Sequence, residues 1–360
     1  MFFGLFSCMT YSLFDHPHFQ SLLVVDDLAA QFKAHAELQA MLAFEAALAD
    51  AEADVGLIPK AAALAISNAI SAYEPDALQQ AAYVARDGLV VPGLIKELRS
   101  RLDQPHRPHL HVGATSQDVI DTGLMIRLKS AFALLADRLR AVIAELDTHA
   151  ATDGDQPLMA KTRMQQALPI RLADRLAGWT TPLVDHLRDL KGLQDHVLAV
   201  QLAGPVGTLD ALGDKGPDIR ARLAQSLGLA DPGGSWHTDR SRIADIAHWL
   251  SKVTGSLGKI GQDVVLMAQN EVGEATIDAG GLSSAMPHKK NPVLAEILVT
   301  LARYNAGQLS LIHQALIHEN ERSGSAWTLE WMVLPSMVAT VGGALKVTSD
   351  MLGTLSFPQN

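Results

Sequence analysis

Apolar side chains recur every three or four residues in four long stretches of the sequence. The longest stretch runs from 116 to about 150, and its apolar positions are Leu128, Phe132, Leu135, Leu139, Val142 and Leu146. This spacing gathers the apolar side chains on one face of a helix, which then packs against neighbouring helices. The other stretches with this pattern are 169–202, 241–270 and 292–318. Four long helices of this kind predict an all-α fold built around a long-helix bundle.

The composition of the 360 residues favours helices and a small-molecule partner. Aromatic residues make up only 5% of the chain and β-branched runs are few, so extensive sheets are disfavoured. The chain has 39 acidic residues against 29 Lys and Arg, which gives a net charge of −10. Nucleic-acid binding needs a surplus of positive charge on some surface, and this balance argues against it.

The cysteine content and the hydropathy bear on the cellular compartment. Cys8 is the single cysteine, so no internal disulfide can form, and a reducing compartment such as the cytoplasm is expected. The N-terminal segment MFFGLFSCMT is apolar but lacks the basic residues of a signal peptide, and Met9 is an alternative start. Because no window of about 18 uninterrupted apolar residues occurs, no membrane span is predicted.

The first third of the chain is organised differently from the rest. Its helical patterns are interrupted by prolines, and one of them, with Leu38, Met41, Leu42 and Leu48, predicts a short helix that stops at Gly56 and Pro59. We therefore predict a small N-terminal helical domain over 1–112 and the bundle over 113–360. The connector 271–291 is long and lacks periodicity, and loops of this kind more often bind ligands than act as spacers.

The end of this connector carries the sequence SSAMPHKKNP (283–292). In one interpretation Asn291 is a helix N-cap and Pro292 is the first helical residue, with the two lysines in solvent. In the other, two hydroxyls, two ammonium groups and an amide beside a helix N-terminus form a site for a carboxylate. The second interpretation accounts for more of the residues, and it makes a serine of this loop a candidate acid or base.

A second group of polar side chains lies in HVGATSQDVIDT (111–122), at the head of the longest helix. Thr115 and Asp118 have the spacing of a capping box, which is a structural interpretation. Thr115, Ser116 and Gln117 also supply hydroxyl and amide donors at a helix N-terminus, where a carboxylate can bind. Two anion sites predict a substrate that carries several negative charges.

The loop SSAMPHKKNP resembles the signature of the fumarase/aspartase superfamily, G-S-S-x-M-P-x-K-x-N, and TSQD (115–118) resembles that superfamily's first block. With GPVGT (204–208) and the helical layout, the resemblance covers nearly the whole chain. It implies an α-helical homotetramer whose active sites combine blocks from three subunits, without metal or organic cofactor. It further implies that Ser283 handles the proton on the carbon beside an activating carboxylate. Lys289 and Asn291 would then stabilise the developing negative charge.

Two further segments are similar to the lactonising branch of the superfamily, which closes 3-carboxymuconate to a lactone in the protocatechuate branch of aromatic catabolism. They are ERSGSAWTLEW (321–331) and WHTDR (236–240). Within them Arg240 and Arg322 are candidates for bidentate binding of substrate carboxylates. Trp327 and Trp331 lie one helical turn apart and are interpreted as a packed pair in the core.

The second block of the superfamily usually contains Thr-His, with the histidine as general acid. This chain has KTRMQQ (161–166) there, which places Arg163 at the histidine position. Arginine stays charged at any working pH and cannot transfer protons. In a lactonisation the attacking group is the substrate's own carboxylate, so we expect Arg163 and the neighbouring Gln165 to bind substrate, with Glu296 as the ion-pair partner of Arg163.

Two other departures from the superfamily pattern concern the loop and the chain length. Leu282 precedes the two serines where Gly is usual, and Gly280 and Gly281 are expected to supply the flexibility. The chain also ends soon after its last bundle helix, whereas most members of the superfamily continue into a small helical third domain. A scaffold without that domain is therefore expected.

The histidines and the glycine-rich connectors leave alternatives to weigh. His106, His109 and His111 lie close together but lack acidic partners at ligand spacing, so no metal site is predicted. His111 either faces the substrate or is a polar residue at a domain junction. The connectors match no nucleotide-binding motif, and no cofactor is expected. The alternative functions are adenylosuccinate lyase or a related amino-acid lyase that releases fumarate, and a non-catalytic bundle protein on the same scaffold.

Overall fold

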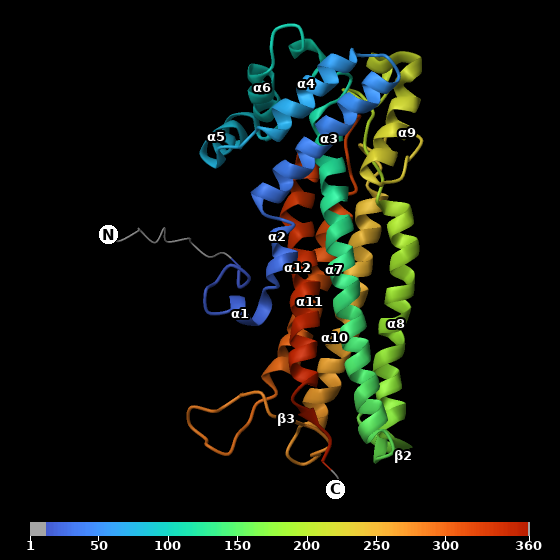
Figure 1. Ribbon diagram of the computed structural model, residues 1–360. Helices are drawn as coiled ribbons and strands as arrows, with labels where there is room; N and C mark the ends of the chain where they lie inside the picture. Colours follow the sequence, from blue (N-terminus) through green and yellow to red (C-terminus); the bar gives the residue numbers. More distant parts are fainter. Residues whose placement is uncertain (1–11, 359–360) are drawn as a thin grey trace, which may run out of the picture.

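The computed structural model describes residues 12–358, and its main feature is a bundle of long helices (Figure 1). These helices are α7 (Ser116–Asp153), α8 (Leu172–Val197), α10 (Ser241–Met267), α11 (Val293–Gln314) and α12 (Ser325–Leu352). The all-α fold and the four long helices expected from the sequence are confirmed, with ends that differ by a few residues. We call the end of the bundle at which α7 begins the upper end and the opposite end the lower end, as they lie in Figure 1.

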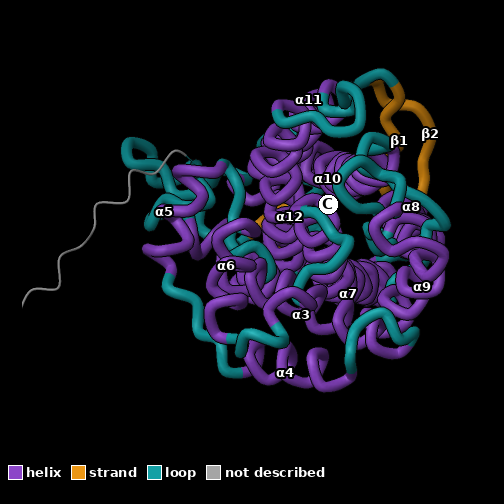
Figure 2. The backbone as a smooth tube through the Cα atoms, turned by 90° about the horizontal axis from the view of Figure 1, so that it is seen from above, coloured by secondary structure: helices purple, strands orange, loops and turns teal. Residues whose placement is uncertain are grey.

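The helix α12 carries no clear apolar stripe, and the apolar spacing of the sequence does not predict it. It lies near the centre of the bundle when seen from above (Figure 2), and in its second half most side chains are buried. A helix that is apolar all round gives no amphipathic signal. By length and composition α12 would suffice to cross a membrane, but 67% of its most apolar window is buried inside the protein, as in a core helix.

The apolar stripe of α7 forms the core of the bundle. Phe132, Leu135 and Leu139 are fully buried, and the ring of Phe132 meets that of Trp249 on α10 edge to face, 5.7 Å between centroids. Burying one such side chain stabilises the fold by about 1.5–3 kcal/mol through the removal of apolar surface from water. Since α10 also packs against α8, α11 and α12, apolar burial joins all the long helices into one unit.

The N-terminal part of the chain folds into shorter helices, the first two along the side of the bundle and the others at the upper end (Figure 1). They are α1 (Gln20–Leu23), α2 (Asp26–Ala30), α3 (Ala34–Asp54), α4 (Lys60–Ser71), α5 (Ala77–Asp87), α6 (Val91–Arg101) and the 3₁₀ turn η1 (Arg107–His109). The expectation of a short helix near residue 40 is wrong, because α3 has 21 residues. Much of its buried face consists of alanines and two glutamates, which weaken the apolar pattern in the sequence.

Two hydrophobic clusters organise the molecule, and they do not follow the chain order. The larger cluster is the bundle core, and it includes Leu23 and Leu28 from α1 and α2. The smaller one joins α3, α4 and α6 to side chains from the upper end such as Leu202 and Ile219, which come from the 198–209 loop and from α9 (Gly216–Leu227). The domain boundary near residue 112 therefore stays a prediction, since segments on each side of it contribute to both clusters.

The lower end carries the few strands of the described chain. Strands β1 (Pro157–Thr162) and β2 (Gln165–Arg171) form an antiparallel hairpin between α7 and α8. Strands β3 (Thr276–Ile277) and β4 (Leu355–Ser356) pair beside it. The connector between α10 and α11 extends outward from this end as a long loop (Figure 1).

Some expectations fall on the N-terminal segment, which lies outside the described residues. They concern Cys8, the alternative start at Met9 and the apolar segment around them.

Candidate active site

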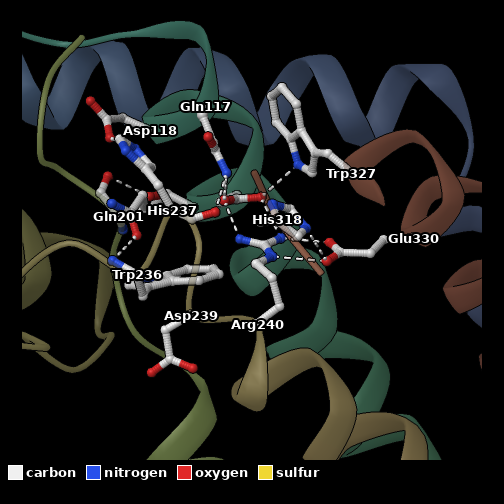
Figure 3. A network of polar contacts seen from close by, with 12 residues as sticks. Gln117, Asp118, Gln201, Trp236, His237, Asp239, Arg240, His318, Trp327 and Glu330 are labelled. Atoms are coloured by element: carbon white, nitrogen blue, oxygen red, sulfur yellow. Dashed lines mark hydrogen bonds and ion pairs between the residues drawn. The ribbon is translucent and has the colours of Figure 1, made fainter. Parts of the chain in front are cut away.

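The first turn of α7 is fixed at the upper end by the buried carboxylate of Asp118. Its Oδ2 accepts hydrogen bonds from the backbone N–H of Thr115 at 3.0 Å and of Gly204 at 3.0 Å. Its Oδ1 accepts from the backbone N–H of Ala203 at 3.1 Å and faces Nε2 of His237 at 2.8 Å. Asp118 thus ties the helix start to two loops, in agreement with its interpretation as a structural residue (Figure 3).

Arg240 lies at the centre of a buried ion-pair cluster and is not open to a substrate. Its guanidinium donates to Asp121 at 2.7 and 3.1 Å and to Glu330 at 2.9 and 2.6 Å, and only 1% of its surface is exposed (Figure 3). The expectation that Arg240 binds a substrate carboxylate is corrected by this pairing. Burial alone would lower the pKa of Arg240, but the two carboxylates outweigh it and raise the pKa.

Glu330 and Asp121 have further partners in the same cluster. Burial tends to raise the pKa of Glu330, yet contacts with His318 and Arg240 prevail and hold its pKa below the ordinary value. The indole N–H of Trp327 donates to Asp121 at 3.1 Å, and the ring of Trp327 meets that of Trp331 edge to face, 4.6 Å between ring centroids. The two rings pack against each other as the spacing indicates, with Trp327 buried in the core and Trp331 half-buried beside it.

Gln117 connects this buried cluster to an exposed cation. Its amide N–H donates to Asp121 at 3.2 Å and to the carbonyl of His237 at 2.9 Å, while its amide oxygen accepts from Nε of Arg322 at 2.9 Å. Gln117 is fully buried, so the expectation that it binds substrate directly is corrected. Arg322 is exposed and also donates to the carbonyl of Pro205 at 3.1 Å, and this arrangement orients its guanidinium at the surface.

Three further predicted site residues, His111, Thr115 and Ser116, also lie at the upper end. Thr115 and Ser116 are half-buried at the N-terminus of α7, where backbone N–H groups and the helix dipole favour an anion. His111 is half-buried in the preceding loop, and its Nδ1 lies 2.6 Å from Oε1 of Glu45 on α3. Burial tends to lower the pKa of His111, but the Glu45 carboxylate outweighs it and raises the pKa.

The loop with Ser283 lies at the lower end. The Oγ of Ser283 accepts hydrogen bonds from the backbone N–H groups of Met286 at 3.0 Å and Ala285 at 3.3 Å. Two N–H dipoles aimed at this oxygen stabilise negative charge on it. Lys289 is exposed in the same loop, and the neighbouring Lys290 pairs with Asp278 at 2.8 Å.

Asn291 closes the base of this loop. Its side-chain N–H donates to the carbonyl of Gly281 at 3.0 Å, and its backbone N–H donates to the same oxygen at 2.8 Å. Gly281 has φ +72°, and a Cβ there would lie 2.1 Å from the carbonyl oxygen of Asn291, so only glycine fits. The interpretation of Asn291 as an N-cap is wrong, because α11 begins at Val293 with Pro292 as its N-cap residue.

The hairpin residues do not meet their predicted partner. Arg163 lies in the tight turn between β1 and β2 with φ +49°, and Arg163 and Gln165 are both exposed. Glu296 is exposed on the first turn of α11, and it forms no ion pair with Arg163 within residues 12–358. The expected ion pair between Arg163 and Glu296 is therefore wrong for the single chain, because the hairpin turn directs Arg163 to solvent.

The predicted site residues thus fall into two groups at opposite ends of the bundle. His111, Thr115, Ser116 and Arg322 lie at the upper end, whereas the Ser283 loop and the hairpin lie at the lower end (Figure 1). The 38 residues of α7 separate the ends by about 57 Å. One copy of the chain does not bring the two groups together.

Sequence reasoning missed several residues that organise the upper end. Asp121, His237 and Glu45 received no role, although each has a partner in or beside the cluster. Glu45 stands on a helix face that otherwise buries mostly apolar side chains, and a charged residue on such a face is a signal of a paired buried group. His318 is fully buried 3.4 Å from Glu330, and no comparable pattern in the sequence indicates it.

Known proteins share this architecture along most of the chain. The profile of a family described as lyase matches residues 23–306. The 3-carboxy-cis,cis-muconate cycloisomerase of Pseudomonas aeruginosa is 40% identical, and the match covers 93% of this chain and 74% of that relative. The enzyme of the same name from Acinetobacter baylyi is 35% identical, and the match covers 93% of this chain and 76% of that relative. The crystal structure of 3-carboxy-cis,cis-muconate lactonizing enzyme from Pseudomonas putida superposes with a TM-score of 0.88 at 36% identity, over 95% of this chain and 77% of that one. The chain belongs to this lyase family, the fumarase/aspartase superfamily.

Proposed function

We propose that the protein is a cycloisomerase that closes 3-carboxy-cis,cis-muconate to 4-carboxymuconolactone. The observation that carries this proposal is the 35–40% identity to relatives of that name over most of the chain. The exposed Arg163 supports it, because a lyase that expels an amine or a hydroxyl benefits from a proton donor at that position, and arginine is not one.

In the proposed reaction one carboxylate oxygen of the substrate bonds to an alkene carbon, and the electron pair of that double bond moves toward the neighbouring carbon. The negative charge spreads into the attached carboxylate, and Lys289 stabilises it there. The Ser283 hydroxyl then gives its proton to the carbon, and solvent later restores that proton. The N–H groups of Ala285 and Met286 stabilise the serine oxygen when its proton leaves. The net reaction is an isomerisation, so no group is lost.

The remaining carboxylates of the substrate need cations and N–H donors. Arg322 offers an exposed guanidinium oriented by Gln117, and the N-terminus of α7 with Thr115 and Ser116 offers backbone and hydroxyl donors. Asn291 supports the reaction by holding the base of the serine loop. Arg163 and Gln165 lie on an exposed hairpin, where they can bind substrate only if another copy of the chain approaches them.

The separation of the two groups leads to the proposal of a homotetramer with shared active sites. Copies that pack their long helices side by side in opposite directions bring the upper end of one chain to the lower end of another. Such an arrangement places the Ser283 loop near Arg322 of a different subunit. It also places a second copy near the exposed Arg163, which is consistent with the lack of an ion-pair partner for this residue within the described chain.

Replacement of Ser283 by alanine tests the proposed reaction. Purified protein is mixed with 3-carboxymuconate, and the ultraviolet absorbance of the conjugated diene is followed. We expect the wild type and the Ser284→Ala control to consume the diene, while Ser283→Ala binds substrate but loses turnover by about a hundredfold or more. Unchanged turnover in Ser283→Ala refutes the assigned role. Release of fumarate from adenylosuccinate, without loss of the diene, supports the lyase alternative instead.

Mixing inactive variants tests the shared site. Ser283→Ala and Arg322→Ala subunits are denatured together, refolded and assayed beside each variant refolded alone. We expect the mixture to recover activity, because some sites then take Ser283 from one chain and Arg322 from another. A mixture as inactive as its components, together with a monomeric mass by light scattering, contradicts the shared site.

A further inference from the structure

The loop before α7 holds His111 in an unusual backbone conformation. Its φ of +63° lies in the left-handed region, which is unfavourable by about 1 kcal/mol or more for a residue other than glycine. Neighbouring Gly113 also has positive φ, at +68°, and its Cα packs against Leu212 so closely that a Cβ would clash. Close packing therefore restricts the backbone of the loop that carries His111.

The imidazole of His111 has one strong partner. Nδ1 lies 2.6 Å from Oε1 of Glu45, whose side chain is fully buried on α3. No hydrogen bond to Nε2 of His111 occurs within residues 12–358, and 14% of this side chain remains exposed. One ring nitrogen is therefore held by a carboxylate from inside, and the other has no hydrogen-bond partner in the described chain. Thr115 and Ser116 follow in the sequence, at the N-terminus of α7.

The charged groups around His111 come from three helices. Glu45 on α3 and Asp118 on α7 favour its protonated form, while Arg99 on α6 and burial oppose it, and the balance raises the pKa of His111. Glu52 also lies on α3, but burial, followed by repulsion from Glu45, raises its pKa to about 9, so it is uncharged at neutral pH. Glu45 is thus the dominant anion that faces this imidazole.

We infer that Glu45 is a positioning residue that holds His111 as an imidazolium, with Nδ1–H bound to Glu45 and Nε2–H left for a carboxylate of the substrate. The inference rests on the proposed function for the identity of that carboxylate, but the state of His111 in the free protein does not depend on it. A buried carboxylate is well suited to this work, because a charge-assisted hydrogen bond in a site shielded from water is short and strong. Glu45 itself does not touch the substrate.

The direct test is a titration of His111 by NMR in the free protein, with the resonance assigned through His111→Gln. We expect the pKa of His111 in the wild type to lie above the ordinary value of 6.5 and to fall by about one pH unit or more in Glu45→Gln. Glu52→Gln is the matched control on the same helix. Because Glu52 is already uncharged, this variant should leave the titration unchanged below about pH 8.

The kinetic test uses the same variants with 3-carboxymuconate. In Glu45→Gln we expect KM to rise about tenfold with a smaller change in kcat, and the alkaline limb of kcat/KM to move to lower pH by the same interval as the NMR titration. If Glu45 has only a structural role, Glu45→Gln shifts neither the alkaline limb of kcat/KM nor the pKa of His111 measured by NMR. That result overturns the inference.

Failure of the proposed function and failure of the role inferred for Glu45 give different results. A wild-type protein that does not consume the diene while its His111 titrates as expected refutes the proposed function and leaves the role of Glu45 intact. A His111 that titrates below 6.5 in the wild type overturns the role of Glu45, and this measurement needs no Glu45 variant to fold.

Discussion

Glu52 is a buried acid whose effect on stability can be measured. Its side chain on α3 is fully buried, and neither carboxyl oxygen has a hydrogen-bond partner in the described structure. Burial, and then repulsion from Glu45, raises its pKa from 4.5 to about 9. The native protein therefore keeps a proton on Glu52 at neutral pH, whereas the unfolded chain releases it.

This difference makes the native state less stable as the pH rises. Between the ordinary pKa of 4.5 and the native value near 9, the unfolded chain is stabilised relative to the native state by about 1.4 kcal/mol for each pH unit. At pH 7.5 the loss amounts to about 4 kcal/mol. Glutamine is uncharged and similar in size to the protonated acid, so Glu52→Gln should raise the free energy of unfolding by about 4 kcal/mol at pH 7.5 and by almost nothing near pH 4.5.

Urea unfolding followed by tryptophan fluorescence measures this effect, at several values between about pH 5 and pH 8 and at one protein concentration, since association also changes apparent stability. The control is Asp54→Asn, which changes an acid at the exposed C-terminal end of the same helix. We expect the difference between Glu52→Gln and wild type to grow steadily with pH and that of the control to stay small. A difference that is constant across the range refutes the reasoning, because it shows that Glu52 is ionised in the native protein.

Two further substitutions test the buried cluster and the serine loop. Glu330→Gln leaves Arg240 buried with only one carboxylate, so we expect a loss of about 3–5 kcal/mol in the free energy of unfolding at pH 7. Because the pKa of Glu330 is held below 4.5, its contribution is present above pH 4.5 and is lost as the pH falls further, and urea unfolding should show this acid dependence in the wild type and not in the variant. Gly281→Ala forces a Cβ against Asn291, so kcat should fall about tenfold or more while thermal unfolding changes little, and unchanged kcat contradicts the assigned loop geometry.

The fold was largely accessible from the sequence, because helix formation depends on local spacing. The stripe from Leu128 to Leu146 predicts α7 to within a few residues of its observed end. The exception is α12, whose side chains are mostly buried, so its sequence shows no clear amphipathic pattern. The length of α7 follows from its local pattern, but α12 and its central position depend on neighbours that the local sequence does not show.

The candidate site was accessible only in part. The serine loop and the TSQD block were found because their residue types stand together in the sequence, and their chemistry can be deduced from that order. Arg240 and Gln117 were misassigned as binding residues, because the residues that bury and pair them lie far away in the chain. Asp121 lies 119 residues from Arg240, and Arg322 lies 205 residues from Gln117.

The sequence by itself determined the helical bundle, the acidic character and the set of groups suited to binding and protonating a polycarboxylate. The tertiary structure decided which of those groups are available. It paired Arg240 with Asp121 and Glu330, left Arg322 exposed, joined His111 to Glu45 and placed the Ser283 loop at the opposite end of the bundle. The physical reason is that a charge can be buried only with a partner, and the chain brings partners together through packing of distant segments, which local sequence does not encode.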